Sequence, residues 1–212
     1  RRKSVFLETV FLLMGSLAKA DGRVSEDEVQ HAEHIFSQLQ LNAEHRAQAI
    51  ELFKKGATAD FDIDATLNKF IEVCGSTRSL RQALLAYLIT LAFADGEFHP
   101  SEEKLLEEIA ARLNFNQAAF QQLLDMIRNQ SHFAGGKVPT KNALDSAYKA
   151  LGVNESASNQ ELKKAYRRLM SQNHPDKLIG QGMPEDMIKV ATEKSKEIQK
   201  AYELIKSQRE TS

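Results

Sequence analysis

The sequence predicts an all-α protein made of two helical domains. Apolar residues recur at helical spacing in one segment after another, and no stretch alternates apolar and polar residues as a half-buried strand would. Only 4 of the 212 residues are proline, so few positions interrupt the helices. Hydrophobic residues make up 42% of the chain, which is enough to build a core in each domain.

The expected helices follow one another along the first domain. Apolar residues at helical spacing place them at residues 5–17, 29–39, 47–53, 67–74, 80–93, 105–113 and 120–127. Gly135, Gly136 and Pro139 then break the pattern, so we expect a mobile and cleavable linker at residues 132–140. The two domains are therefore expected at residues 1–131 and 141–212.

An internal repeat lies within the first domain. Residues 17–42 align without a gap on residues 91–116, with ten identities in 26 positions, and both copies carry Ala-Asp-Gly, at residues 20–22 and 94–96. Two related halves predict a pseudo-symmetric helical bundle.

The repeated Asp and Glu residues admit either a metal site or helix caps. In the first copy Ser25 stands three residues before Glu28, which is the spacing of a capping box. The second copy has His99, Pro100 and Glu102 at the matching positions, and proline suits the first position of a helix. The EF-hand pattern is absent. We therefore expect caps and no metal site.

Motifs typical of enzymes are missing. Glu28-x-x-His31 would matter in a di-iron bundle, but such a site needs a second pair, and Leu105 occupies the position that matches His31. A solvated helix face is the expected alternative. The remaining candidates are scattered histidines that indicate no site: His45, His99 and His132. No phosphate-binding loop, nucleophile elbow or zinc-protease motif occurs, so we expect neither an enzyme nor a cofactor.

Cysteine content and hydropathy narrow the class of protein. Cys74 is the single cysteine, which excludes an internal disulfide framework and fits a reducing compartment; its apolar helical neighbours predict a buried thiol. No apolar run, residues 10–14 included, approaches the roughly 20 residues that span a bilayer. The chain opens on Arg1, Arg2 and Lys3, a triplet that suits either an ordinary charged terminus or the cytoplasmic flank of a membrane span.

Charge divides unevenly along the chain. Residues 1–136 hold 14 basic and 19 acidic side chains, whereas residues 137–212 hold 14 basic and 10 acidic ones. The positive excess therefore belongs to the C-terminal part, where it suits an acidic partner surface.

A basic helix ending at His-Pro-Asp-Lys is the most informative feature of the second domain. Four cations lie beside its apolar stripe: Lys163, Lys164, Arg167 and Arg168. Pro175 is expected to end this helix near His174 and to leave His174, Asp176 and Lys177 in a turn. The basic face alone suits solvent, an acidic protein or nucleic acid, although Asp176 would be repelled by phosphates.

Caps and turn residues complete the second domain. Ser158 and Glu161 form a capping box at the start of the basic helix. Pro184, Glu185 and Asp186 are expected to open the last helix. Packed antiparallel against the basic helix, the last helix would complete a hairpin with the His-Pro-Asp-Lys turn at its tip.

Residues 145–205 resemble a J domain, the module of DnaJ-type co-chaperones. The resemblance runs through four ordered blocks: AYKALGV (147–153), ELKKAYRRLM (161–170), HPDK (174–177) and EIQKAYELI (197–205). Asn173 stands where the family usually has an aromatic residue, and the segment after Lys177 is several residues longer than usual. The resemblance implies that the domain stimulates a DnaK-type chaperone ATPase. The residues that it implies in this contact are His174, Pro175, Asp176, Lys163, Tyr166, Arg167, Arg168 and Lys177.

The doubled Ala-Asp-Gly signature resembles the TerB-like, or tellurite-resistance, domain. A TerB-like domain followed by a J domain is the layout of a family of membrane-anchored DnaJ-like co-chaperones. This resemblance implies a stress-response protein at the cytoplasmic face of the bacterial inner membrane, anchored through an N-terminal segment missing from this chain. The N-terminal domain would then serve regulation or bind a partner or client. Two alternatives remain: a nucleic-acid-binding protein using residues 160–173, and a metal-dependent TerB-like stress protein.

Overall fold

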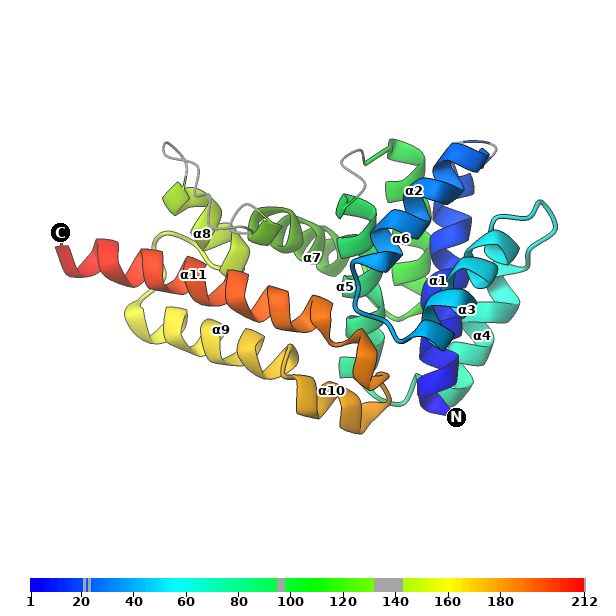
Figure 1. Cartoon of the computed structure of the whole chain (residues 1–212). Coiled ribbons are helices and arrows are strands. Elements are labelled where there is room, and N and C mark those ends of the chain that lie inside the picture. The colour runs from blue at the N-terminus through cyan, green and yellow to red at the C-terminus, as the bar shows by residue number, and fades with distance from the viewer. Residues whose placement is uncertain (21, 23, 95–97, 132–142, 212) are drawn as a thin grey trace. The chain divides into compact units, whose positions relative to one another are not determined.

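The computed structural model describes residues 1–20, 22, 24–94, 98–131 and 143–211 (Figure 1). Within these residues the chain forms eleven α-helices, a short 3₁₀ helix and no strand, so the predicted all-α class is confirmed. Asp21, Asp95, Gly96 and the linker expected at residues 132–140 lie outside the described residues, and the domain boundary there stays a prediction. No helix in the described part of the chain is both long and apolar enough to cross a bilayer.

The described residues form two compact units. The first comprises Arg1–Gln117 and Leu178–Val190, and the second comprises Ala118–Lys177 and Ala191–Ser212. The first unit contains six helices of the N-terminal part: α1 (Arg2–Lys19), α2 (Glu26–Ser37), α3 (Ala43–Gly56), α4 (Ile63–Cys74), α5 (Arg78–Ala94) and α6 (Pro100–Arg112). The remaining elements are α7 (Gln117–Gln130), α8 (Ala143–Leu151), α9 (Asn159–Gln172), α10 (Pro175–Gln181), the 3₁₀ helix η2 (Glu185–Met187) and α11 (Lys189–Thr211).

Helix α1 is the central helix of the first unit and contacts α3, α4, α5 and α6. Its Phe11 ring packs edge-on against Phe36, with centroids 4.8 Å apart, and Phe36 in turn meets Phe53 at 5.8 Å. Where α1 crosses α3, a Cβ on Gly15 would overlap the Phe53 carbonyl oxygen, and one on Gly56 would overlap the backbone of α1. Glycine at both positions therefore allows the two backbones to approach closely.

The internal repeat is visible in the elements themselves. Helices α2 and α6 begin 74 residues apart, and so do α3 and α7. Gln40 and Asn114 precede α3 and α7 at matching positions and are both left-handed, with φ of 61° and 67°. A non-glycine residue rarely adopts this conformation, so its occurrence twice at the repeat offset is strong support for two related halves. However, α3 lies in the first unit, whereas all of α7 after Gln117 lies in the second.

Side-chain expectations for the first unit are partly confirmed. Ser25 caps α2, because its Oγ accepts a hydrogen bond from the Glu28 N–H at 3.2 Å. Pro100 is the first residue of α6 and His99 is its N-cap, as expected, although the His99 side chain itself makes no cap bond. Cys74 is fully buried, as expected, and burial raises the pKa of its thiol.

In the second unit, α9 and α11 run antiparallel (Figure 1). Apolar side chains from both helices join others from α7 and α8 in one buried cluster: Met126, Ala147, Tyr148, Ala150, Leu151, Leu162, Leu169, Ile198, Ala201 and Ile205. The expected pairing of the basic helix with the last helix is therefore confirmed. The cluster also includes Met126 of α7, a helix that the sequence assigned to the N-terminal domain.

The segment between α9 and α11 contains two short helices. Pro175 begins α10, and Glu185–Met187 form η2. The expectation that Pro184, Glu185 and Asp186 open the last helix is wrong, because α11 begins only at Lys189. The backbone of Pro184 is extended, with ψ of 142°, and the residues after it close a single 3₁₀ turn. Because Asp186 lies in η2 and not in the first turn of α11, its side chain is available for a contact outside that helix.

Candidate functional site: the basic helix and the turn that follows it

Helix α9 forms as its sequence predicts. Ser158 caps its first turn, accepting a hydrogen bond from the Glu161 N–H at 3.1 Å. Leu162, Ala165 and Leu169 are 2%, 4% and 5% exposed, so one stripe of the helix is buried in the core of the second unit. Burial of this stripe fixes the rotation of the helix about its own axis, which determines the face that its charged residues present.

Four cations occupy the exposed face of α9. Lys163, Lys164, Arg167 and Arg168 are all exposed, and none forms an ion pair with another residue of the described chain. Lys163 and Arg167 are four residues apart, as are Lys164 and Arg168, so like charges repel within the helix. The face carries positive charge that the described residues leave unneutralised, and it suits an acidic surface.

Tyr166 has a structural role within the unit. Its ring is half-buried and stacks on the Tyr202 ring of α11, with centroids 4.1 Å apart and an interplanar angle of 14°. Burial and the nearby Glu203 carboxylate raise the pKa of the Tyr166 hydroxyl. Tyr166 therefore helps to hold α9 against α11, which agrees with the expected packing of the last helix against the apolar stripe of the basic helix.

Helix α9 ends before Pro175, as predicted, but the residues after the proline are not an open turn. The last residue of α9 is Gln172, and Pro175 begins α10. The expectation that Asp176 and Lys177 lie in a turn is wrong, since both belong to the first turn of α10. Proline disfavours the helical conformation for the residue before it, yet its own fixed φ suits the first position of a new helix.

His174 connects the two helices in a defined way. The Asp176 N–H donates a hydrogen bond of 3.2 Å to Nδ1 of the His174 ring, so the side chain caps the start of α10. Because Nδ1 accepts this bond, the proton of the neutral ring is on Nε2. His174, Asp176 and Lys177 are exposed and Pro175 is half-buried. The junction of α9 and α10 at residues 174–177, called the turn below, thus presents an exposed imidazole and an exposed carboxylate.

Asn173 replaces aromatic packing with hydrogen bonds. Its side-chain Nδ2 donates to the Leu169 carbonyl at 2.9 Å, and its own carbonyl accepts from the Ser195 hydroxyl of α11 at 3.5 Å. The Leu169 carbonyl also accepts the Asn173 backbone N–H at 3.1 Å, so Asn173 binds the last turn of α9 through both its backbone and its side chain. The end of α9 is therefore fixed without the aromatic side chain.

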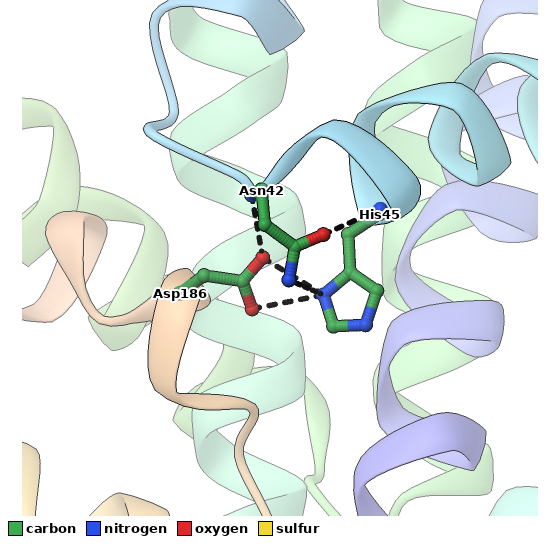
Figure 2. A network of polar contacts seen from close by, with 3 residues as sticks. All are labelled: Asn42, His45 and Asp186. Carbon is green, nitrogen blue, oxygen red and sulfur yellow. Dashed lines mark hydrogen bonds and ion pairs between the residues drawn. The ribbon is translucent and has the colours of Figure 1, made fainter.

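A second polar cluster lies in the first unit, and the sequence gave no sign of it (Figure 2). His45 Nδ1 donates to Asp186, with contacts of 2.8 and 2.9 Å to the two carboxylate oxygens. The Asn42 N–H donates to the same carboxylate at 2.9 Å. The sequence treated His45 as a scattered histidine, because its partner lies 141 residues away and no local pattern joins them.

The acidic face of α2 borders a cavity of about 400 Å³ within the first unit. Glu28 and His31 are exposed, as expected of a solvated helix face, and they line this cavity together with His99 and the buried Glu102. Its apolar lining comes from α1, α2, α3 and α5: Met14, Leu17, Ala18, Ala32, Ile35, Phe36, Phe53, Leu91 and Ala92. Among the described residues, no group of three or more His, Cys, Asp or Glu side chains is arranged to hold a metal ion.

Comparison with known proteins covers nearly the whole chain. Residues 7–125 match the family described as Tellurite resistance protein TerB, and residues 146–211 match the DnaJ domain. A protein named "Co-chaperone protein DjlA" from Photobacterium profundum is 38% identical over 219 residues, which is 98% of this chain and 79% of that protein. Proteins of the same name from Coxiella burnetii and Vibrio cholerae are 38% and 36% identical, each over 98% of this chain and 78% and 79% of their own lengths. No solved structure matches the chain.

Proposed function

We propose how this chain, which belongs to the DjlA family of co-chaperones, engages its partner: through the exposed His174-Pro175-Asp176 turn and the basic face of α9. The chain is a co-chaperone whose J domain stimulates ATP hydrolysis by a DnaK-type chaperone, and it is not an enzyme itself. The observation that carries the proposal is that exposed cations, which make no ion pair with a described residue, adjoin an exposed carboxylate and imidazole.

The two parts of the site have different tasks in this proposal. Lys163, Arg167 and Arg168 attract an acidic surface of the chaperone and orient the encounter, since exposed charges act mainly on association. Lys177 adds positive charge beyond the turn. Tyr166 stacks on Tyr202 and so holds α9 in the orientation that exposes its basic face. His174 and Asp176 then make the contacts that promote hydrolysis. Asp176 offers a carboxylate to a cation of the chaperone, and His174 offers its Nε2–H as a hydrogen-bond donor.

The test measures ATP hydrolysis by a DnaK-type chaperone in a single turnover, with the wild-type chain or with His174→Gln. Glutamine retains polarity but does not reproduce the imidazole cap on the Asp176 N–H, so we expect stimulation to fall to near the unstimulated rate. The matched control is His34→Gln, which changes an exposed histidine of α2 and should stimulate as the wild type does. Equal stimulation by His174→Gln and wild type would exclude His174 from the site.

The N-terminal unit serves regulation or the binding of a partner or client in this proposal. The cavity beside α2 supports it, because an apolar lining with a polar rim suits an apolar side chain of a protein partner. Ala32→Phe would fill part of the cavity. Proteins retained from a lysate by wild type but lost with Ala32→Phe would be candidates, and identical retention by both would exclude the cavity as their site.

We also place the protein at the cytoplasmic face of the bacterial inner membrane, attached through an N-terminal segment. The support is the family resemblance in layout, a TerB-like domain followed by a J domain. Fractionation of cells producing the natural full-length protein tests this. Recovery in the cytosolic fraction after lysis without detergent would contradict it.

A further inference from the structure

The long segment after the turn is packed into the first unit. Residues Leu178–Val190 belong to that unit, whereas Lys177 and the turn before it belong to the second. Leu178, Met183 and Met187 are 2%, 2% and 0% exposed, so the apolar side chains of the segment are buried. Such burial distinguishes the segment from a surface loop, which would leave its side chains in solvent.

Asp186 completes the cap of a helix in the N-terminal part. Asn42 is the N-cap of α3, and its Oδ1 accepts from the His45 N–H at 2.8 Å. In a capping box, a Glu or Gln at the position of His45 would accept the N–H of the cap residue in return. His45 does not do so. Instead Asp186 accepts the Asn42 N–H at 2.9 Å and pairs with the His45 ring (Figure 2).

This contact is the least exposed of several that tie the segment to the first unit. The Asp186 and His45 side chains are only 17% and 29% exposed, so solvent screens their pairing less than it screens a surface ion pair. The other ties are weaker or more exposed: Lys3 with Glu185 at 3.8 Å, Arg2 with the Gln181 carbonyl at 3.5 Å, and Lys189 with the Gln38 carbonyl.

The charge of Asp186 also acts on a buried tyrosine of the first unit. Tyr87 of α5 is 2% exposed, and burial and then the negative charge of Asp186 raise the pKa of its hydroxyl. The Asp186 charge is therefore close to the core of the first unit as well as to the start of α3.

We propose that Asp186 is a positioning residue for the chaperone-binding turn: by completing the cap of α3, it anchors the segment that follows the turn and holds the C-terminal end of α10 in place. The role rests on the proposed function of the turn. Helix α10 is only seven residues long and begins at Pro175, so fixing its end restricts the orientations available to His174 and Asp176. A turn held in its binding orientation binds more tightly, because less conformational freedom is lost on binding.

This role predicts that loss of the anchor lowers the affinity for the chaperone but leaves the maximal ATPase stimulation unchanged. Release of the segment would leave the turn intact but populate the competent orientation for only part of the time, which raises the apparent dissociation constant in proportion. Saturating co-chaperone should then restore full stimulation. We therefore expect Asp186→Ala to raise the concentration for half-maximal ATPase stimulation by roughly three- to tenfold and to leave the maximum unchanged.

The matched control is Glu185→Ala, which removes the neighbouring, 77% exposed carboxylate and, among the described residues, its long contact to Lys3. It should behave as the wild type. Asp186→Asn keeps an acceptor for the Asn42 N–H and should recover part of the lost affinity. His45→Ala combined with Asp186→Ala should cost little more than Asp186→Ala alone, because both changes remove the same contact.

Hydrogen exchange separates local release from general loss of structure. In the full chain, Asp186→Ala should speed exchange of amides in residues 178–190 and of the Asn42 amide about tenfold, the size expected for losing a hydrogen bond to a charged group. Amides in the middle of α9 and α11 should keep their wild-type rates, which shows that the fold persists.

The two proposals fail in different ways. If the wild-type chain does not stimulate the chaperone, the function of the turn is wrong and the positioning role is wrong with it. If the wild type stimulates and Asp186→Ala has the same half-maximal concentration, the positioning role alone is overturned. A lower half-maximal concentration would also overturn it, since the anchor would then restrain the turn instead of preparing it.

Discussion

Asp176 and Asp186 lie ten residues apart on one segment and have opposite surroundings. Asp176 is exposed at the start of α10, and its carboxylate makes no ion pair with a described residue. Asp186 is mostly buried and accepts hydrogen bonds from a backbone N–H and an imidazole. A carboxylate whose acceptor capacity is used within the molecule stabilises the fold, whereas one left open is available to a partner. The comparison predicts which property each substitution will change.

Asp176→Asn should have the largest effect of any single substitution on ATPase stimulation and almost none on stability. Truncating one side of a desolvated charge pair costs about 2 to 5 kcal/mol, so we expect stimulation to fall more than tenfold. Surface substitutions usually change stability by only about 0.5 kcal/mol, so the melting temperature should stay within about 2 °C. Single-turnover hydrolysis and circular dichroism measure the two properties. Asp60→Asn, at another exposed aspartate, is the control, and full stimulation by Asp176→Asn would contradict the role of the turn.

Reversing the charge of the α9 face should have the next largest effect on stimulation. Arg167→Glu with Arg168→Glu should slow association several-fold, because exposed charges steer the encounter. Added salt should reduce wild-type stimulation and narrow the difference in association rate between the wild type and the double variant. The reason is that the screening length falls from about 10 Å at 0.1 M salt to about 3 Å at 1 M. Stopped-flow association across a salt series measures this.

The control for this pair makes the same change in net charge elsewhere in the second unit. Lys200→Glu with Lys206→Glu alters two exposed lysines of α11. Equal slowing by both pairs would mean that net charge matters and that the face of α9 has no special role.

Asp186→Ala should lower the melting temperature, whereas Asp176→Asn should leave it nearly unchanged. Loss of hydrogen bonds to a charged group costs about 1.5 to 3 kcal/mol, and each kcal/mol lowers Tm by roughly 2 to 4 °C in a protein of this size. We expect a decrease of several degrees in differential scanning calorimetry. A Tm equal to that of the wild type would mean that the Asp186 carboxylate, like that of Asp176, contributes nothing to the stability of the fold.

Glu197 is a third carboxylate and should show the smallest effect. Half-buried on α11, it has a pKa raised to about 7, because burial outweighs the opposing charge of nearby Lys194. The folded state therefore binds its proton more tightly than the unfolded state does. Stability from this group is complete below pH 4.5 and is lost as pH rises through about 7. Glu197→Gln should flatten the dependence of Tm on pH between 4.5 and 7, and an unchanged slope would assign that dependence to other groups.

The local features of the site follow from sequence, because their causes are local. The Ser158 cap, the buried stripe of α9 and its exposed cations each depend on residues within one or two helical turns. The end of α9 before Pro175 is equally local. Proline both ends one helix and begins the next. The expected turn after His174 follows from the first property alone, so it did not include the start of α10.

The contacts of Asp186 and the surroundings of α7 could not be predicted in this way. Asp186 meets Asn42 and His45 across more than 140 residues, and only the folded chain brings them together. The internal repeat correctly related α3 to α7. However, related sequences adopt the same backbone conformation more readily than they pack against the same residues. Gln40 and Asn114 illustrate the first point, with the same left-handed backbone in both halves.

The packing of α7 has a practical consequence for dividing the chain into fragments. Met126 joins the core of the second unit, its Sδ lies close to Gly152, and the Gln130 side chain donates to the Ala150 carbonyl at 3.0 Å. An isolated J-domain fragment that starts at residue 141 would lose both contacts. Water would reach the apolar flank of α8, and such a fragment would be prone to self-association. Fragments intended for solution studies should therefore begin before α7, at or ahead of residue 117.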